Sequence, residues 1–219
     1  MITAQVIGSQ LPSVAYASTV SGSISGTATY AGQNVGVPGG RRFLIVAAVT
    51  SGGNVGTIPL SLTCNGAPMT LLANDTKTLL SNYTSFWGLL VPSGATADFV
   101  LTMTNATTAQ ASLAIWSVKG LRSMTPTAAV ASSATPAALS LTVQPHGVVI
   151  ASAGSAINGT TYTWSGLTRD YVSATGSATN VARSAASAVS PAGGTPLAVT
   201  CTYSIVSPTN ERALAIALR

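Results

Sequence analysis

The stretch Phe43-Leu44-Ile45-Val46-Ala47-Ala48-Val49 is an unbroken apolar run that follows the basic pair Arg41-Arg42. A β-strand that is covered on both faces has such a continuous run, whereas a strand with one wet face alternates apolar and polar residues. The segments 58–63, 99–104 and 197–202 do alternate. We therefore expect a layered β structure in which residues 43–49 form an inner strand.

Strand patterns recur along the chain as short β-branched runs bounded by Gly, Pro, Asn and Ser. No segment combines helical spacing with capping residues at both ends. The alanine-rich segment 178–189 comes closest to a helix, but its Thr and Val content favours a strand. The sequence thus predicts an all-β fold, an antiparallel β-sandwich of the jelly-roll-like kind.

The second half of the sequence echoes the first in the order and spacing of its strand and turn residues. The matched segments are 63–66 with 163–166, 91–94 with 190–193, 99–104 with 197–202, and 113–116 with 214–217. The echo predicts an internal duplication, with one half at about 27–122 and the other at about 137–219. The halves would form either one two-layer sandwich or two sandwiches that pack together.

Residues 1–26 stand outside this repeat. The segment Ser18–Thr27 is rich in Ser, Thr and Gly and poor in apolar residues, which suits an extended arm or an edge strand. We predict an N-terminal arm over residues 1–26 and the duplicated sandwich over residues 27–219. The stretch 123–138 is expected to connect the halves.

The residues that carry most enzymatic chemistry are scarce, since the 219 residues include four Asp or Glu and one His. General acid–base, nucleophilic and metal chemistry draw on Asp, Glu, His and Cys. His146 lies in the turn 144–147, and no nucleophile elbow of the G-x-S-x-G kind accompanies it. The acids occur in or beside turns; they are Asp75, Asp98, Asp170 and Glu211. We predict a protein that is not an enzyme, with no catalytic residues, metal site or cofactor.

The charge and hydropathy of the sequence indicate which kinds of partner to expect. Charged residues make up 6% of the chain, against roughly 25% in an ordinary domain, and the bases are scattered apart from Arg41-Arg42. No specific nucleic-acid binding is therefore expected. Apolar runs are far shorter than the roughly 20 residues of a spanning helix, and the N-terminus does not resemble a signal peptide, so we expect no membrane association.

Cys64 and Cys201 are expected to be buried thiols, or a disulfide if their strands are neighbours.

Two pairs of residues are candidates for contacts with other molecules. Trp164 and Tyr162 lie beside a turn and are candidate glycan contacts, because aromatic rings provide stacking surfaces. Arg41 and Arg42 lie at a strand start and are candidate assembly contacts. A β-sandwich with so few charges also lacks the usual electrostatic protection against association, which favours a homo-oligomer or a larger symmetric assembly.

Four segments of the first half together resemble a known class of proteins. They are Gly40–Val49, Thr63–Leu71, Pro92–Gly94 and Ala114–Leu121. These segments are similar to those of β-sandwich virion proteins encoded by tailed bacteriophages and related gene-transfer particles. The resemblance transfers no functional residue.

The resemblance implies a structural role in the virion. The chain would be a head decoration or head/tail-attached protein, bound in many symmetric copies to capsid or tail proteins of the same particle. It would be assembled in the host cytoplasm and released by lysis. The alternative is a receptor-recognition module of a tail or spike that binds host-surface glycans. Head or tail location and oligomeric order stay open.

Overall fold

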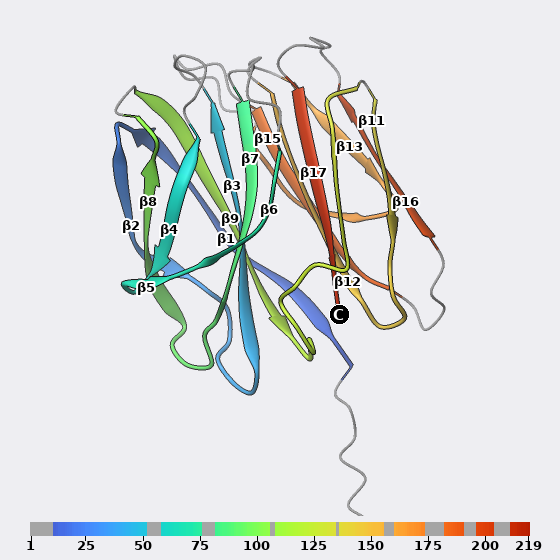
Figure 1. Cartoon of the computed structure of the whole chain (residues 1–219), viewed down its shortest axis with the longest axis horizontal. Helices are drawn as coiled ribbons and strands as arrows, with labels where there is room; N and C mark the ends of the chain where they lie inside the picture. The colour runs from blue at the N-terminus through green and yellow to red at the C-terminus, as the bar shows by residue number, and fades with distance from the viewer. Residues whose placement is uncertain are drawn as a thin grey trace, which may run out of the picture.

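The protein is built from β-strands. The computed structural model describes residues 11–51, 58–75, 82–105, 108–134, 136–155, 160–173, 182–190, 196–203 and 211–219. Within these ranges the chain forms seventeen strands and no helix, and the strands pair in antiparallel sheets (Figure 1). The all-β, sandwich-type fold predicted from the sequence is confirmed.

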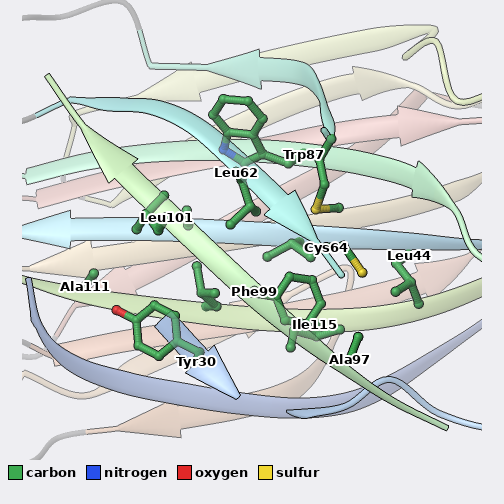
Figure 2. Packing of buried hydrophobic residues seen from close by; sticks show 14 of the residues in the cluster. Tyr30, Leu44, Leu62, Cys64, Trp87, Ala97, Phe99, Leu101, Ala111 and Ile115 are labelled. Carbon is green, nitrogen blue, oxygen red and sulfur yellow. The ribbon is translucent and has the colours of Figure 1, made fainter. Parts of the chain in front are cut away.

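The first half of the chain forms two sheets. Inner sheet 1 has the order β1 (Ser13–Ile24), β9 (Ala109–Lys119), β3 (Arg42–Ser51), β7 (Asn82–Leu90), β6 (Thr70–Asn74). Outer sheet 1 has the order β2 (Thr27–Asn34), β8 (Thr96–Met103), β4 (Pro59–Cys64), β5 (Ala67–Pro68). The side chains between the two sheets form the first core, shown in Figure 2.

The second half forms two more sheets. Inner sheet 2 has the order β10 (Ala128–Ser132), β17 (Glu211–Leu218), β12 (Val148–Ser155), β15 (Ala182–Val189), β14 (Thr168–Ser173). Outer sheet 2 has the order β11 (Ala137–Thr142), β16 (Pro196–Tyr203), β13 (Tyr162–Ser165). Small and branched aliphatic side chains dominate the second core. The chain therefore contains two sandwiches, which decides a question that the sequence left open.

The two sandwiches have the same strand order. In the first, the strands pair from the outside in: β1 with β9, β2 with β8, β3 with β7, and β4 with β5. In the second, β10 pairs with β17, β11 with β16, and β12 with β15. Inner sheet 2 repeats the order of inner sheet 1 when β10 is placed on β1, and outer sheet 2 likewise repeats outer sheet 1 without β5.

One match drawn from the sequence is wrong by one residue. Leu113 pairs with Ala48 and packs in the first core, whereas Leu214 packs between the sandwiches. In the pairing of the strands, Trp116 lies beside Ile45 of β3, and Ile216 lies beside Ile150 of β12. Trp116 and Ile216 both pack between the sandwiches, so these two residues are the equivalent pair. Because strand side chains alternate between faces, a shift of one residue exchanges the core face for the opposite face.

A third apolar cluster joins the sandwiches through their inner sheets. Leu44 and Val46 of β3 point into the first core, while Phe43, Ile45 and Ala47 point toward inner sheet 2. Both faces of β3 are thus covered, as its continuous apolar run predicted. The layers follow in the order outer sheet 1, inner sheet 1, inner sheet 2, outer sheet 2 (Figure 1).

The inner sheets face one another with their strand orders running in opposite directions. Strand β3 contacts β12, its equivalent, and β7 contacts β17. At the far side, Tyr16 of β1 stacks on Tyr171 of β14 with ring centroids 6.4 Å apart. The first sandwich thus packs against the second through strands at the middle and at the far side of its inner sheet.

Gly154 of β12 lies where the inner sheets approach closely. A methyl group at this position would come within 2.7 Å of Val49 Cγ1 on β3. We predict that Gly154→Ala lowers the free energy of unfolding by about 1–3 kcal/mol, because Val49 must move in a packed interface. Urea denaturation measures the change.

The control is Gly22→Ala in β1. The nearest neighbour of its added methyl would be Tyr30 Cε1 at 3.7 Å, an ordinary contact. We expect a change within about 0.5 kcal/mol for this variant. Equal losses in the two variants would contradict a specific role of the close approach at Gly154.

Two sequence predictions concern the chain ends and the thiols. Ser13–Ile24, part of the predicted arm over residues 1–26, is instead the edge strand β1, with Ile24 buried in the first core. The edge-strand alternative was therefore correct for this segment, and residues 1–10 lie outside the described ranges.

Cys64 and Cys201 are free and buried in different cores, so they do not form a disulfide. Burial also raises the pKa of the Cys64 thiol.

Candidate functional site

The two outer sheets expose broad faces on opposite sides of the molecule (Figure 1). Outer sheet 1 carries a row across its strands made of Thr27, Thr102 and Ser61. Outer sheet 2 carries an equivalent row made of Ala138, Thr200 and Ser165. These side chains lie on the solvent face because their neighbours in sequence fill the cores. Both faces therefore present hydroxyl and methyl groups.

Charge is nearly absent from these outer faces. No strand of outer sheet 2 contains a charged residue, and the strands of outer sheet 1 contain one, Asp98. The Asp98 carboxylate accepts a hydrogen bond from the Gly32 amide at 2.6 Å. Its backbone pairs with Asn65, whose side-chain oxygen accepts the Asp98 N–H at 2.8 Å. Asp98 thus stabilises the local loop geometry, and the surrounding surface is suited to packing against another surface of low charge.

The prediction that Arg42 is an assembly contact is wrong. The Arg42 side chain is fully buried. Its guanidinium donates hydrogen bonds to carbonyl oxygens of two loops; they belong to Val35, Gly36, Val91, Ser93 and Gly94, at 2.7–3.3 Å. Burial lowers the pKa of Arg42. The residue closes one end of the first sandwich and cannot reach a partner.

Its neighbour Arg41 remains available for contacts. The Arg41 side chain is exposed, lies 5.4 Å from the centroid of the Phe43 ring and donates to the Arg122 carbonyl at 3.2 Å. Arg41 directly precedes β3 and lies over Phe43, whereas Arg42 is on the strand face of Leu44, which explains why one arginine is solvated and the other is buried. The assembly contact predicted for Arg41 stays a prediction.

The two aromatic residues predicted to contact glycans, Tyr162 and Trp164, also differ in exposure. Tyr162 is 1% exposed and belongs to the second core, so its prediction as a glycan contact is wrong. Trp164 is half-buried against the same core, and its indole N–H donates to Ser184 Oγ at 2.9 Å. Both residues point inward because Thr163 between them occupies the exposed face.

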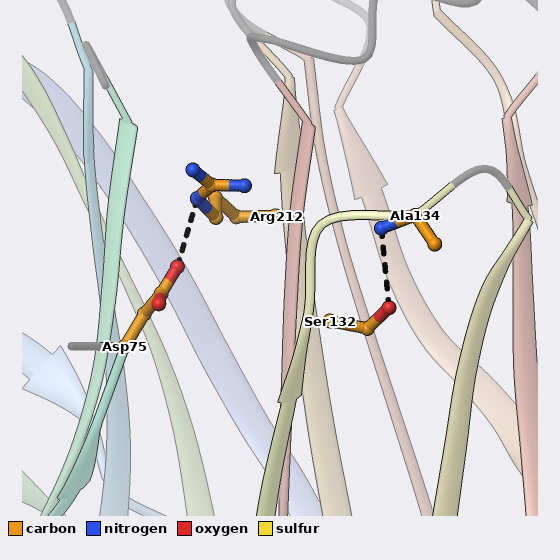
Figure 3. A network of polar contacts seen from close by, with 4 residues as sticks. All are labelled: Asp75, Ser132, Ala134 and Arg212. Atoms are coloured by element: carbon orange, nitrogen blue, oxygen red, sulfur yellow. Dashed lines mark hydrogen bonds and ion pairs between the residues drawn. The ribbon is translucent and has the colours of Figure 1, made fainter. Parts of the chain in front are cut away.

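The acids have structural partners. Asp75 forms a buried ion pair with Arg212 across the interface between the sandwiches, with 2.8 Å between Asp75 Oδ2 and Arg212 Nε (Figure 3). Asp170 Oδ2 accepts the indole N–H of Trp116 at 2.9 Å. His146 is exposed in its turn with a φ of 58°. The side chain of Glu211 lies outside the described residues.

The polar end of the interface between the sandwiches was not predicted from the sequence. Arg183 and Arg212 are both buried there. Arg212 shares a strand face with Leu214, Ile216 and Leu218, which fill the interface. The period-two alternation after Arg212 could have identified it as a buried arginine, because it continues an apolar face.

Comparisons with known proteins identify no relative. No family model, curated protein or solved structure matches the chain. Among the residues that the structure describes, no three His, Cys, Asp or Glu side chains are grouped so that they could hold a metal ion. The described ranges also contain no helix long and apolar enough to cross a membrane.

Proposed function

We propose that the chain is a non-enzymatic virion structural protein of a tailed bacteriophage or a related gene-transfer particle. It binds the assembled particle in many symmetric copies, as a head decoration or a head/tail-attached protein. The observation that carries the proposal is the pair of nearly uncharged hydroxyl and methyl faces on opposite outer sides of the double sandwich.

Such faces suit repeated contacts for two physical reasons. Thr, Ser and Ala side chains lose little conformational entropy when they are packed. A face without charges also avoids the desolvation penalty that buried ions carry, which is several kcal/mol per ion. Two faces on opposite sides let one copy contact two neighbours, or a neighbour and the particle surface.

The strand order supports the same proposal. We propose that the nested pairing of each sandwich corresponds to a jelly roll, an architecture used by viral capsid domains and also by lectins. We propose that the two sandwiches arose by duplication, since their strand orders agree. Three of the segment pairs matched in sequence also lie on or beside equivalent strands; they are 63–66 with 163–166, 99–104 with 197–202, and 113–116 with 214–217. Fold alone does not determine function, so the outer faces carry the argument.

The contacts of the acids support a role other than catalysis. The carboxylates of Asp75, Asp98 and Asp170 are engaged by Arg212, Gly32 and Trp116 respectively. Each contact stabilises a loop or an interface. No pair of carboxylates remains poised in a common cleft in the part of the chain that the structure describes.

A titration onto particles that lack this protein tests the proposal. We expect binding that saturates at a copy number fixed by the particle symmetry. Ser140→Lys on outer sheet 2 or Thr29→Lys on outer sheet 1 should weaken binding at least about tenfold, because a buried ammonium group costs more than 1.4 kcal/mol. Both residues are exposed. Cosedimentation with the particles measures the bound copies.

Thr70→Lys is the matched control, because Thr70 is exposed on β6, an edge strand of inner sheet 1. It should bind like the wild type. The proposal fails if both outer-face variants bind normally. It also fails if the chain binds host-surface glycans instead and loses that binding in Trp164→Ala.

A further inference from the structure

Two buried arginines flank Gly154 on the face of inner sheet 2 that packs against inner sheet 1. The register pairs Gly154 with Arg212 of β17 on one side and with Arg183 of β15 on the other. Strands lie about 4.8 Å apart, so the two arginine backbones are separated by roughly 10 Å. Arg183 is 6% exposed and Arg212 is 1% exposed.

The two arginines differ in their partners. Arg212 forms the ion pair with Asp75 described above. Arg183 contacts a neutral group, donating from Nη2 to Ser51 Oγ on β3 at 3.4 Å. Among the described residues, the Arg183 Nε–H has no acceptor. In this part of the chain, the interface thus holds one guanidinium with a counter-charge and one without.

The described groups around Arg183 are neutral hydroxyls and amides. Tyr171 of β14, on the same face, has a buried hydroxyl with no hydrogen-bond partner among the described residues, and it lies close enough to interact electrostatically with Arg183. Opposite, Ser51 pairs in register with Asn82 and Gln110, which are neutral. Asp170, the acid nearest in sequence on β14, accepts from Trp116 and makes no ion pair with Arg183 in the described part of the chain.

A buried cation without a counter-charge is costly, because desolvation is not offset by attraction. Burial accordingly lowers the pKa of Arg183. Within the described ranges the Arg183 Nε–H and the Tyr171 hydroxyl both lack a hydrogen-bond partner, and both can donate. A small anion would satisfy both groups and neutralise the charge. The planar guanidinium favours an oxyanion, since it can donate two parallel N–H bonds to two oxygens.

We propose that the polar end of the interface between the sandwiches is an oxyanion-binding site, with Arg183 as its charged ligand and Tyr171 as a second donor. The ligand class is a small tetrahedral or planar oxyanion, either inorganic phosphate or sulfate, or a carboxylate. Because the anion bridges side chains on one sandwich and lies against the other, its binding stabilises the pairing of the two. The inference is independent of the proposed virion role.

Thermal unfolding of the full chain tests this site with inorganic phosphate, sulfate and acetate as probes. Chloride at the same ionic strength is the reference. We expect the Tm to rise with probe concentration beyond the chloride reference, because a ligand that binds only the folded state stabilises it. A response to phosphate and sulfate assigns a tetrahedral oxyanion, whereas a response to acetate alone assigns a carboxylate.

Arg183→Gln should lose this response, and its Tm without added oxyanion should equal or exceed that of the wild type. Arg122→Gln is the matched control, because Arg122 is exposed, and it should respond like the wild type. The proposal is overturned if no probe exceeds chloride, or if Arg183→Gln responds like the wild type.

A second variant keeps the test valid if Arg183→Gln folds poorly. Arg183→Lys keeps the charge but loses the planar fork, and should bind phosphate at least about tenfold more weakly. Titration of phosphate followed by ³¹P line broadening measures this difference directly. Equal affinities for phosphate in the wild type and Arg183→Lys would also overturn the assignment.

Discussion

Arg42→Met should be among the most destabilising single substitutions in the protein, lowering the free energy of unfolding by about 5 kcal/mol or preventing folding. The guanidinium is fully buried and bonds five carbonyl oxygens in the segments 35–36 and 91–94. Methionine fills much of the space but donates no hydrogen bond. Each carbonyl left buried without a donor costs about 1–3 kcal/mol, and local opening of the loops recovers part of this.

Arg41→Met is the adjacent control for this experiment. Arg41 is exposed, with one hydrogen bond to the Arg122 carbonyl and a cation–π contact with Phe43. We expect a loss within about 1 kcal/mol for this variant. Urea denaturation followed by circular dichroism compares the two. Similar losses would mean that the buried hydrogen bonds of Arg42 do not hold the loops.

Asp75→Ala should lower the free energy of unfolding by about 3–5 kcal/mol, the usual cost of removing one member of a buried ion pair. Asp75 is 3% exposed and Arg212 is 1% exposed, so solvent cannot replace the lost carboxylate. The pair joins the loop after β6 in the first sandwich to β17 in the second. Its loss therefore weakens the contact between the sandwiches.

A double variant distinguishes the ion pair from simple packing. Asp75→Ala combined with Arg212→Met removes both charges, and should be more stable than Asp75→Ala alone because the Arg212 cation is no longer buried without its carboxylate. Asp98→Ala is the control for loss of an exposed acid, with an expected loss of about 1 kcal/mol. If Arg212→Met instead lowers the free energy of unfolding further when it is added to Asp75→Ala, the two charges are not coupled.

The sequence predicted part of the candidate site and missed the rest. The low charge and the Thr-rich alternating strands predicted uncharged faces that carry hydroxyl groups. In a strand with a period of two, alternate side chains lie on the same face, so the hydroxyls gather on one side whichever sheet covers the other. The same alternation could not assign Arg42, since a basic residue at a strand start is solvated in most proteins. Arg42 is buried here because two loops distant in sequence turn their carbonyls toward it.

Local pattern was sufficient for the all-β class and for the inner position of residues 43–49. These features depend on the side-chain period and on turn residues, both of which are encoded within a few positions of the chain. Tertiary structure alone decided that the halves are separate sandwiches, that Cys64 and Cys201 lie apart, and that Arg183 and Arg212 are buried together. Those outcomes depend on which sheet faces meet, and that choice is made by the summed burial of apolar surface across segments far apart in sequence.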